Sequence, residues 1–309
     1  MNKGADTAGH VAFLKSLDPQ TRQRIKQKSD LRGLIHLGVH WGLVVAVGTL
    51  IALRVPWWPG LVPVQGILII FSFSILHECT HQTPFRSAWL SECAGRIAGF
   101  LVGLPFLWFR YFHLAHHRHT NDPALDPELQ AASKPDSTAQ YLWAMSGIPV
   151  WAGQIRTLIL IAAGRVQPDF TPGPAQNKMR TEATIFVSLY ALIGLYSLFV
   201  STILLSTWIL PVILGQPFLR LFLLAEHGRC PMVADMFENS RTTYASRLVR
   251  FLSWNMSYHA EHHANPNVPF YRLPEFNRLA AGALKTTSAG YPAFHRSYLN
   301  AIRHRWGTG

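Results

Sequence analysis

Long apolar stretches alternate with polar ones along the chain, and they predict four membrane-spanning helices. The first, Leu34–Leu53, has about the ~20 residues that cross the hydrocarbon core of a bilayer. The second, Leu61–Leu76, is short, but a helix that continues through the next residues, HECTH, would lengthen it. Ala183–Ala225 contains over forty nearly uncharged residues, which is enough for two spans and a tight turn. Two transmembrane hairpins are therefore predicted.

Two weaker apolar segments favour helices that lie in the membrane interface or dip partway into the bilayer. Ala94–Phe112 is interrupted by glycines and by Pro105, and Pro149–Ala163 carries a glutamine and an arginine in its middle. The stretch 171–178, TPGPAQNK, is the expected break between the two halves of the membrane part.

Charges predict the orientation of the chain in the membrane. Seven Lys and Arg residues precede the first span, whereas the two turns predicted on the other side contain only Arg54. The positive-inside rule therefore places both termini in the cytoplasm. The prediction is a single domain over residues 1–309: a cytoplasmic segment 1–33, a membrane part 34–225 with a cytoplasmic loop at about 113–182, and a cytoplasmic part 226–309.

Composition agrees with a membrane protein and narrows its partners. Charged residues make up 14% of the 309 residues, against ~25% in soluble domains. The net charge of +12 comes from basic residues that flank the apolar segments, which favours lipid head groups over nucleic acid. Three cysteines without a CxxC pair argue against a disulfide framework, and no signal-peptide pattern indicates a cleaved export signal.

Nine histidines gather in three short motifs and one single position, and we expect them to bind metal. In HECTH, HLAHH and HAEHH the histidines recur three or four residues apart, which places them on one helix face. Such clustered groups repel one another when protonated, so a shared cation in place of the protons is favoured. The candidates are His77, His81, His113, His116, His117, His227, His259, His262 and His263.

The number of histidines indicates more than one metal ion. Imidazole suits zinc, copper, iron and nickel, and a single zinc takes four ligands, so nine histidines point to two metals. HECTH also matches the HExxH motif of zinc proteases, but that interpretation leaves the other two motifs unexplained. Outside the motifs, His36 and His40 are expected to be satisfied core residues, and His10, His295 and His304 to be solvated.

HECTH, HLAHH and HAEHH, in this order and with apolar hairpins between them, resemble the membrane fatty acid desaturase superfamily. The resemblance covers roughly Leu61 to Phe276, and WNMSYHAEHHANPNVPFYRLPEF looks especially like that family's C-terminal motif and its sequel. It implies an all-α integral membrane protein with four transmembrane helices, interfacial helices and a cytoplasmic histidine-rich cap. In that cap the nine histidines would hold two iron ions.

The implied reaction is O2-dependent desaturation of a fatty acyl chain in a lipid or thioester. Hydroxylation or ketolation of a lipid, carotenoid or similar hydrocarbon by the same site stays open, since both begin with hydrogen abstraction. Neither an HPGG motif nor a GxGxxG motif occurs in the sequence, so a separate electron donor, ferredoxin-like or cytochrome, is expected. A transporter is disfavoured because His36, His40, Gln65 and Gln216 form no evident relay.

Further residues have two interpretations each. Asp122, Asp126 and Glu261 are candidates to orient the ligand imidazoles, although NDPALDPE equally fits a turn. His119, outside the motif spacing, is a candidate to support the ligands from behind. Three further residues, Gly38, Trp41 and Gly42, could line a substrate channel, but ordinary helix packing is the interpretation we favour.

Overall fold

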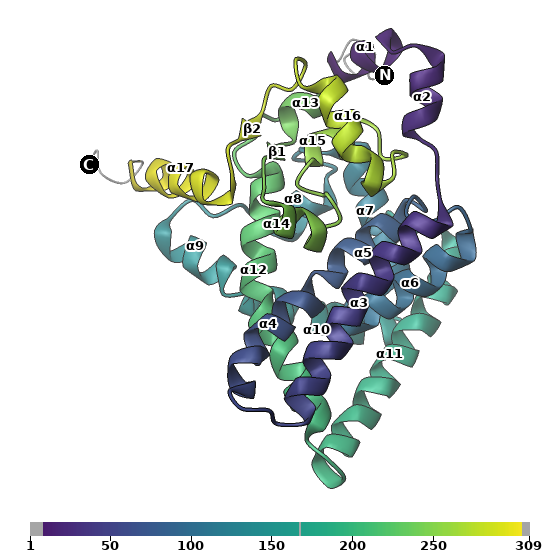
Figure 1. The fold of residues 1–309 in the computed structure, drawn as a ribbon, viewed down its shortest axis with the longest axis vertical. Coiled ribbons are helices and arrows are strands. Elements are labelled where there is room, and N and C mark those ends of the chain that lie inside the picture. The colour runs from purple at the N-terminus through teal and green to yellow at the C-terminus, as the bar shows by residue number, and fades with distance from the viewer. Residues whose placement is uncertain (1–8, 167, 305–309) are drawn as a thin grey trace.

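The computed structural model describes residues 9–166 and 168–304. Nearly all of the regular secondary structure in these residues is helical. Four long apolar helices extend from one side of a compact cap (Figure 1). They are α3 (Asp30–Ala52), α4 (Trp58–Ile70) continued by α5 (Ser72–Thr80), α11 (Gly173–Phe199), and the π-helical η1 (Leu205–Ile209) continued by α12 (Leu210–His227).

Two bent helix pairs accompany these spans. One consists of α6 (Ala88–Leu101) and α7 (Phe106–His119), which meet at 101°, and the other of α9 (Thr138–Met145) and α10 (Ile148–Ala162), which meet at 54°. The bend in the first pair falls at Gly103, whose φ is +76°, and at Pro105, which confirms the predicted interruption. The interfacial placement of both pairs stays a prediction.

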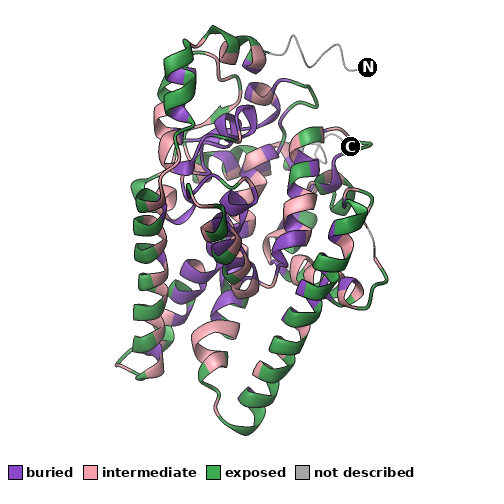
Figure 2. Ribbon diagram, turned by 90° about the vertical axis from the view of Figure 1, so that its right-hand side faces the viewer, coloured by how far each residue is buried: buried purple, intermediate pink, exposed green. Residues whose placement is uncertain are grey.

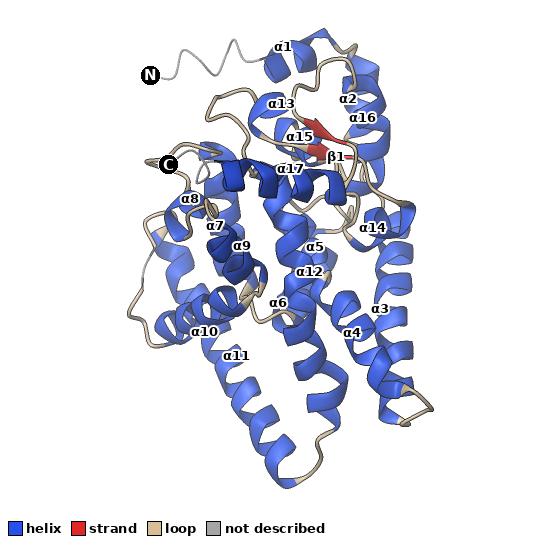
Figure 3. Ribbon diagram, turned by 90° about the vertical axis from the view of Figure 1, so that its left-hand side faces the viewer, coloured by secondary structure: helices blue, strands red, loops and turns tan. Residues whose placement is uncertain are grey.

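Short elements build the cap at the other end of the molecule. They are α1 (Gly9–Ser16), α2 (Pro19–Ile25), α8 (Pro127–Ala131), α13 (Met236–Asn239), α14 (Arg247–Leu252), α15 (His259–Ala264), the 3₁₀ turn η2 (Phe270–Arg272), α16 (Leu273–Ala280) and α17 (Tyr291–His304). Within the described residues the sheet consists of β1 (Thr242–Thr243) and β2 (Thr287–Ser288), paired in parallel (Figure 3).

The helix that carries HECTH confirms the prediction that the second span continues into this motif. α4 and α5 together run from Trp58 to Thr80, with a single non-helical residue, Phe71, between them. The preceding turn holds Trp57 and Trp58, and the Trp57 side chain is 89% exposed, as is usual for a tryptophan at a membrane interface.

Glycines allow α4 and α12 to cross at close range. A Cβ on Gly66 would lie 2.2 Å from the Pro211 carbonyl oxygen, and one on Gly215 would lie 2.2 Å from the Gly66 carbonyl oxygen. Small residues at such a crossing let two helix backbones touch. This contact sets the position of α12, and therefore of His227 at its end, relative to α5.

The third span begins earlier than predicted. α11 starts at Gly173 rather than near Ala183, so most of the stretch 171–178 is helix and not a break. Pro174 occupies the first turn, where a missing N–H costs nothing. The first turns of α11 are polar, but Met179, Glu182 and Ala183 on them are buried. The Glu182 carboxylate accepts a hydrogen bond of 2.7 Å from the Leu107 N–H.

The burial pattern separates a lipid-facing surface from an interior. Exposed residues follow the outer faces of the long helices, whereas buried residues collect where the helices enter the cap (Figure 2). In α11 and the turn after it, Leu198, Phe199 and Val200 are more than 70% exposed. Large apolar side chains on a spanning helix are stable in this setting because lipid replaces water around them.

Polar residues within the spans hold neighbouring helices together. The amide of Gln65 donates to the carbonyls of Val44 and Thr207, both at 3.1 Å. His40 is buried between the Leu68 carbonyl, 2.9 Å from Nε2, and the Trp254 indole N–H, 3.2 Å from Nδ1. The prediction that His40 is a satisfied core residue is confirmed.

His36 also matches its expectation, whereas the glycines of the first span do not. The Nε2 atom of His36 lies 2.9 Å from the Phe251 carbonyl, and the ring packs among aromatic side chains. A Cβ on Gly38 or Gly42 would meet nothing within 4 Å, so neither residue packs helices or lines an internal channel. Both face outward, while Trp41 turns inward and its N–H lies 3.4 Å from Ser72 Oγ.

The expectation of solvated histidines is wrong for two of three positions. His10 is 9% exposed, and its ring lies 3.1 Å from Asp235 at the start of α13, because α1 folds back onto the cap. His295 is half-buried, with Nδ1 2.9 Å from the Tyr141 hydroxyl and Nε2 2.9 Å from the Leu221 carbonyl. The side chain of His304 lies outside the described part of the chain.

Candidate metal centre

Four helices deliver all nine candidate histidines to one place inside the cap. His77 lies in the last turn of α5 and His81 directly follows this helix, while His227 is the last residue of α12. The ends of two spans therefore lie at the site. α7 presents His113, His116 and His117 on one face, and the short α15 presents His259, His262 and His263. The predicted convergence of the three motifs and the single histidine is therefore observed.

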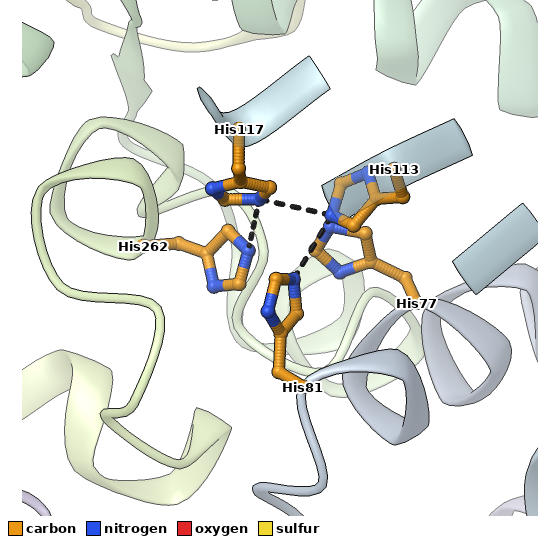
Figure 4. Close-up of side chains that lie close together, drawn as sticks. All are labelled: His77, His81, His113, His117 and His262. Atoms are coloured by element: carbon orange, nitrogen blue, oxygen red, sulfur yellow. Dashed lines mark hydrogen bonds between the residues drawn. The ribbon is translucent and has the colours of Figure 1, made fainter. Parts of the chain in front are cut away.

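The first group contains five imidazoles. One ring nitrogen from each lies within 4.8 Å of the corresponding nitrogen of the others, and the rings point toward a common centre (Figure 4). The Nε2 atoms form a chain: His81 to His113 is 3.0 Å, His113 to His117 is 2.9 Å and His117 to His262 is 3.2 Å. His77 completes the group, and both of its ring nitrogens are buried without a hydrogen-bond partner.

The second group lies beside the first. Ring nitrogens of His116, His227 and His263 are within 4.8 Å of one another, and all three residues are buried. His259 stands at the edge of this group, with its Nε2 3.0 Å from the Nε2 of His227. The two groups are in direct contact, because the rings of His117 and His263 stack with their centroids 4.0 Å apart.

Hydrogen bonds behind the second group determine which nitrogen faces the centre. Nδ1 of His116 lies 2.9 Å from the Asp126 carboxylate, and Nδ1 of His227 lies 3.2 Å from the Asn239 carbonyl. A carbonyl oxygen only accepts, and an ionised carboxylate likewise, so each Nδ1 carries the proton and each Nε2 presents a lone pair. These two Nε2 atoms are 3.2 Å apart.

Two facing lone pairs at that distance repel each other unless a cation lies between or beside them. The donor set therefore fits a metal ion: neutral imidazoles, bare Nε2 atoms directed inward and Nδ1 atoms tied to acceptors behind. All-imidazole sites suit iron, zinc, copper and nickel, and two groups match two ions better than one.

Burial keeps most of these imidazoles neutral and available as ligands; at His116 burial is outweighed by the carboxylates of Glu128 and Asp126, which raise its pKa. In α15, burial and the neighbouring imidazoles hold the pKa values of His259, His262 and His263 well below the usual range of histidine. At the end of α5, burial and then the Arg110 guanidinium lower the pKa of His81 to about 3. A protonated histidine cannot ligate a metal, so the environment favours the ligating form.

Among the residues proposed to orient ligands, only Asp126 does so. The Asp122 carboxylate instead accepts from the Ala124 N–H at 2.9 Å, so it forms the turn that was the alternative interpretation. Glu261 points away from the metal groups and accepts hydrogen bonds from Thr242 and Asn277, which tie α15 to β1 and α16. In the described structure no hydrogen bond joins the His119 ring to a ligand imidazole.

Other groups behind the ligands were missed from the sequence. The Glu226 carboxylate lies 3.2 Å from Nδ1 of His259, and that of Glu128 lies 3.2 Å from Nδ1 of His116. The Thr120 hydroxyl lies 3.1 Å from Nδ1 of His263. Glu226 directly precedes His227 in AEHG, but nothing in that tetrapeptide indicates that the carboxylate serves a histidine of another helix.

Glu78, the acidic residue of HECTH, has a structural position. Its carboxylate accepts hydrogen bonds from the Thr83 hydroxyl at 2.9 Å and from the Phe270 N–H at 3.2 Å. Its other oxygen is 3.9 Å from Nδ1 of His262, which is beyond hydrogen-bond distance. Glu78 therefore links α5 to the segment after α15 through one carboxylate oxygen.

Comparison with known proteins adds a family to this geometry. Residues 56–295, more than half of the chain, match the family model described as fatty acid desaturase. The matched region contains all three histidine motifs and the single His227, so the resemblance noted from the sequence extends over the whole candidate centre.

Curated relatives of the chain are named as desaturases, and three of them are from bacteria. The sequence is 26% identical to sn-1 oleoyl-lipid 12-desaturase of Synechocystis sp., over 88% of this chain and 80% of the relative. It is 25% identical to dihydrorhizobitoxine desaturase of Bradyrhizobium elkanii, over 84% and 79%. A third relative, sn-1 acyl-lipid omega-3 desaturase (ferredoxin) of Synechocystis sp., is 24% identical over 91% of this chain and 70% of its own length.

Proposed function

Because this chain belongs to the fatty acid desaturase family, we propose that it is an O2-dependent di-iron oxidoreductase that introduces a double bond into a fatty acyl chain of a lipid or thioester. The nine histidines are the proposed ligands of two iron ions. The relatives named as acyl-lipid desaturases support the substrate class, and the long apolar helices support access from the membrane.

The observation that carries the proposal is the pair of adjacent imidazole groups. Five histidines face one point, three face a second, and His259 stands at the edge of the second group. When bound there, iron supplies with O2 the oxidising power to remove hydrogen from an unactivated methylene, which no amino-acid side chain provides.

The protein's own part is to orient the ligands and to exclude water. Asp126, Glu128 and Glu226 face Nδ1 atoms of ligand histidines, which directs the Nε2 lone pairs inward. Within the two groups, His262 is fully buried and His116 is 3% exposed, so the reacting methylene would meet few water molecules. Such exclusion protects an oxidising site from side reactions.

A separate electron donor, ferredoxin-like or cytochrome, is part of the proposal. The word ferredoxin in the name of one relative supports the first of these two classes. Turnover by the purified protein with reduced ferredoxin, and its absence with ferredoxin omitted, would test this point directly.

The deciding experiment is lipid mass spectrometry of a host that expresses the chain. We expect a new species lighter by two hydrogens, and fragmentation would locate its double bond. A species heavier by one oxygen would instead identify a hydroxylase that uses the same ligands, and the desaturase proposal would be abandoned.

Ligand substitutions complete the test. His117→Ala and His262→Ala each remove a ligand of the first group, so we expect loss of turnover and a fall in bound iron by about half, as one of two ions is lost. His119→Ala is the matched control, because it lies in the same helix and its ring bonds no ligand. Full activity of His262→Ala would refute the ligand assignment.

A further inference from the structure

A cleft of about 250 Å³ lies on the cap where the first long apolar helix begins. It joins two segments that are far apart in the sequence, the connection between α2 and α3 and the 3₁₀ turn η2. Its lining residues are Gln27, Lys28, Ser29, Arg32, Tyr271 and Arg272. Three of these six side chains are cationic, and none is a carboxylate.

Two of the cations keep an uncompensated charge. Lys28 donates a hydrogen bond of 2.6 Å to the Gln82 carbonyl, which is neutral. The Arg32 guanidinium lies 5.5 Å from the centroid of the Tyr271 ring, and within the described chain it forms no ion pair. Both side chains can therefore attract an anion to the cleft.

The third cation, Arg272, shares a carboxylate partner with another arginine. Arg272 Nη1 and Arg24 Nε each lie 2.8 Å from an oxygen of Glu275, so one acidic group serves two basic groups. The Nε of Arg272 is buried without a hydrogen-bond partner. Asp30, the acidic residue of α3, accepts hydrogen bonds from the N–H and the hydroxyl of Ser87, each at 2.8 Å.

Apolar surface continues from the charged cleft along the same helix. Leu31 is 69% exposed and Ile35 is 58% exposed. Ile35 follows Arg32 by three residues, so Ile35 and Arg32 lie on one face of α3. A ligand that fills both surfaces must be amphipathic, with an anionic head and an apolar tail.

We propose that this cleft binds the phosphate-bearing head group of an anionic membrane lipid, whose acyl chains lie along Leu31 and Ile35. Arginine forks and a lysine beside a spanning helix are the side chains that hold lipid phosphates. The assignment does not rest on the proposed desaturation, because the cleft contains none of the nine histidines.

The cleft nevertheless adjoins the metal centre. Lys28 is bonded to the carbonyl of Gln82, the residue after His81, and Tyr271 follows Phe270, whose N–H bonds Glu78. A lipid bound in the cleft therefore stabilises two segments that position ligand histidines.

Native mass spectrometry of the purified full-length protein in neutral detergent, titrated with phosphatidylglycerol, tests the proposal. The double variant R32Q/R272Q should bind this lipid about twenty-fivefold more weakly, at about fivefold for each charge removed. R32Q alone, which breaks no ion pair, should lose about fivefold and guards against a folding defect in the double variant. The control R278Q, at an exposed position of α16, should bind as the wild type does.

Further arms identify the ligand. An uncharged galactolipid should bind the wild type and R32Q/R272Q equally, and millimolar inorganic phosphate should not displace phosphatidylglycerol. Displacement by inorganic phosphate would assign the cleft to a soluble phosphate compound and overturn the lipid assignment. Unchanged lipid binding by both variants, with weaker binding of an acidic ferredoxin, would assign the cleft to a protein carrier instead.

Discussion

At the scale of single residues, the centre depends on a clear division of roles among acidic side chains. Asp122 and Asp126 lie four residues apart in one loop, yet only Asp126 reaches an imidazole. Glu128, two residues after Asp126, approaches the same imidazole, and Glu226 approaches His259 from another helix, while Glu261 and Glu78 join elements of the cap. The distance in sequence between a carboxylate and a histidine motif therefore does not predict whether that carboxylate contacts a ligand histidine.

The two aspartates offer a matched pair for measurement. Asp126→Asn replaces the acceptor behind His116 with an amide, so we expect iron affinity to fall by about 10–100-fold. Asp122→Asn preserves the turn acceptor at a half-buried position and should bind iron as the wild type does. Iron content after dialysis against graded chelator measures both, and equal loss in the two variants would contradict the assignment.

At the scale of elements, the crossing of α4 and α12 determines where two groups of ligands meet. His77 and His81 extend from the first of these helices through α5, and His227 ends the second. Because the backbones touch at Gly66 and Gly215, a small change at the crossing is carried along two stiff helices to the centre.

We expect Gly66→Ala to lower the free energy of unfolding by about 1–3 kcal/mol, since the added methyl would overlap the Pro211 carbonyl. Gly60→Ala in the same helix is the control, because a Cβ there meets nothing within 4 Å. Thermal unfolding in detergent compares the two. Equal stability of both variants would show that the helices are not held at this distance.

The docking of α1 onto the cap should depend on pH. Burial lowers the pKa of His10 below its usual ~6.5, although Asp235 acts in the opposite direction. The undocked segment therefore binds more protons, and docking should weaken as the pH falls below about 6.5. Burial would raise the pKa of Asp235, but the hydrogen bonds from Lys285, His10 and Phe237 together outweigh it and lower the pKa, so Asp235 stays ionised in this range.

Hydrogen exchange of the α1 amides between pH 7 and pH 5, corrected for the intrinsic rate, measures this effect. We expect a few-fold loss of protection in the wild type. The variant His10→Gln carries no titrating group at this position and should lose the pH dependence. The other charged groups at the contact, Lys285 and Glu238, form an ion pair of 2.8 Å. A wild-type profile that is flat over this range would contradict the prediction.

At the scale of the whole molecule, the four long helices bring both described ends of the chain to the side of the cap (Figure 1). The turns at the far ends of the helices, residues 53–57 and 200–204, contain Arg54 as their one charged residue. Seven basic residues precede the first span, so the positive-inside rule predicts a cytoplasmic cap.

Thiol labelling in whole cells tests that orientation. In a background where the exposed Cys93 is replaced by serine, Ser201→Cys should react with a membrane-impermeant reagent in intact cells. Arg278→Cys, on the cap, should react only after permeabilisation. The reverse pattern would place the histidine centre outside the cytoplasm and would exclude a cytoplasmic electron donor.

The sequence by itself determined the features that are repeated along the chain. Four apolar stretches of spanning length predicted four long helices, because a bilayer requires about 20 apolar residues in each. The three- and four-residue spacing of the histidines predicted the shared helix faces of the three motifs, whereas the single His227 was proposed from its place at the end of the last span. The start of α11 was wrong, because the polar first turns of this helix carry no apolar signal.

Tertiary structure decided which residues support those ligands. Asp126, Glu226 and Thr120 meet histidines through contacts between different segments, and His10 is buried only because α1 folds back onto α13. The division of the histidines into groups of five and three likewise follows from the crossing of helices, since HLAHH and HAEHH each contribute to both groups. Spacing along one helix specifies a face, but contacts between faces arise only when the helices pack.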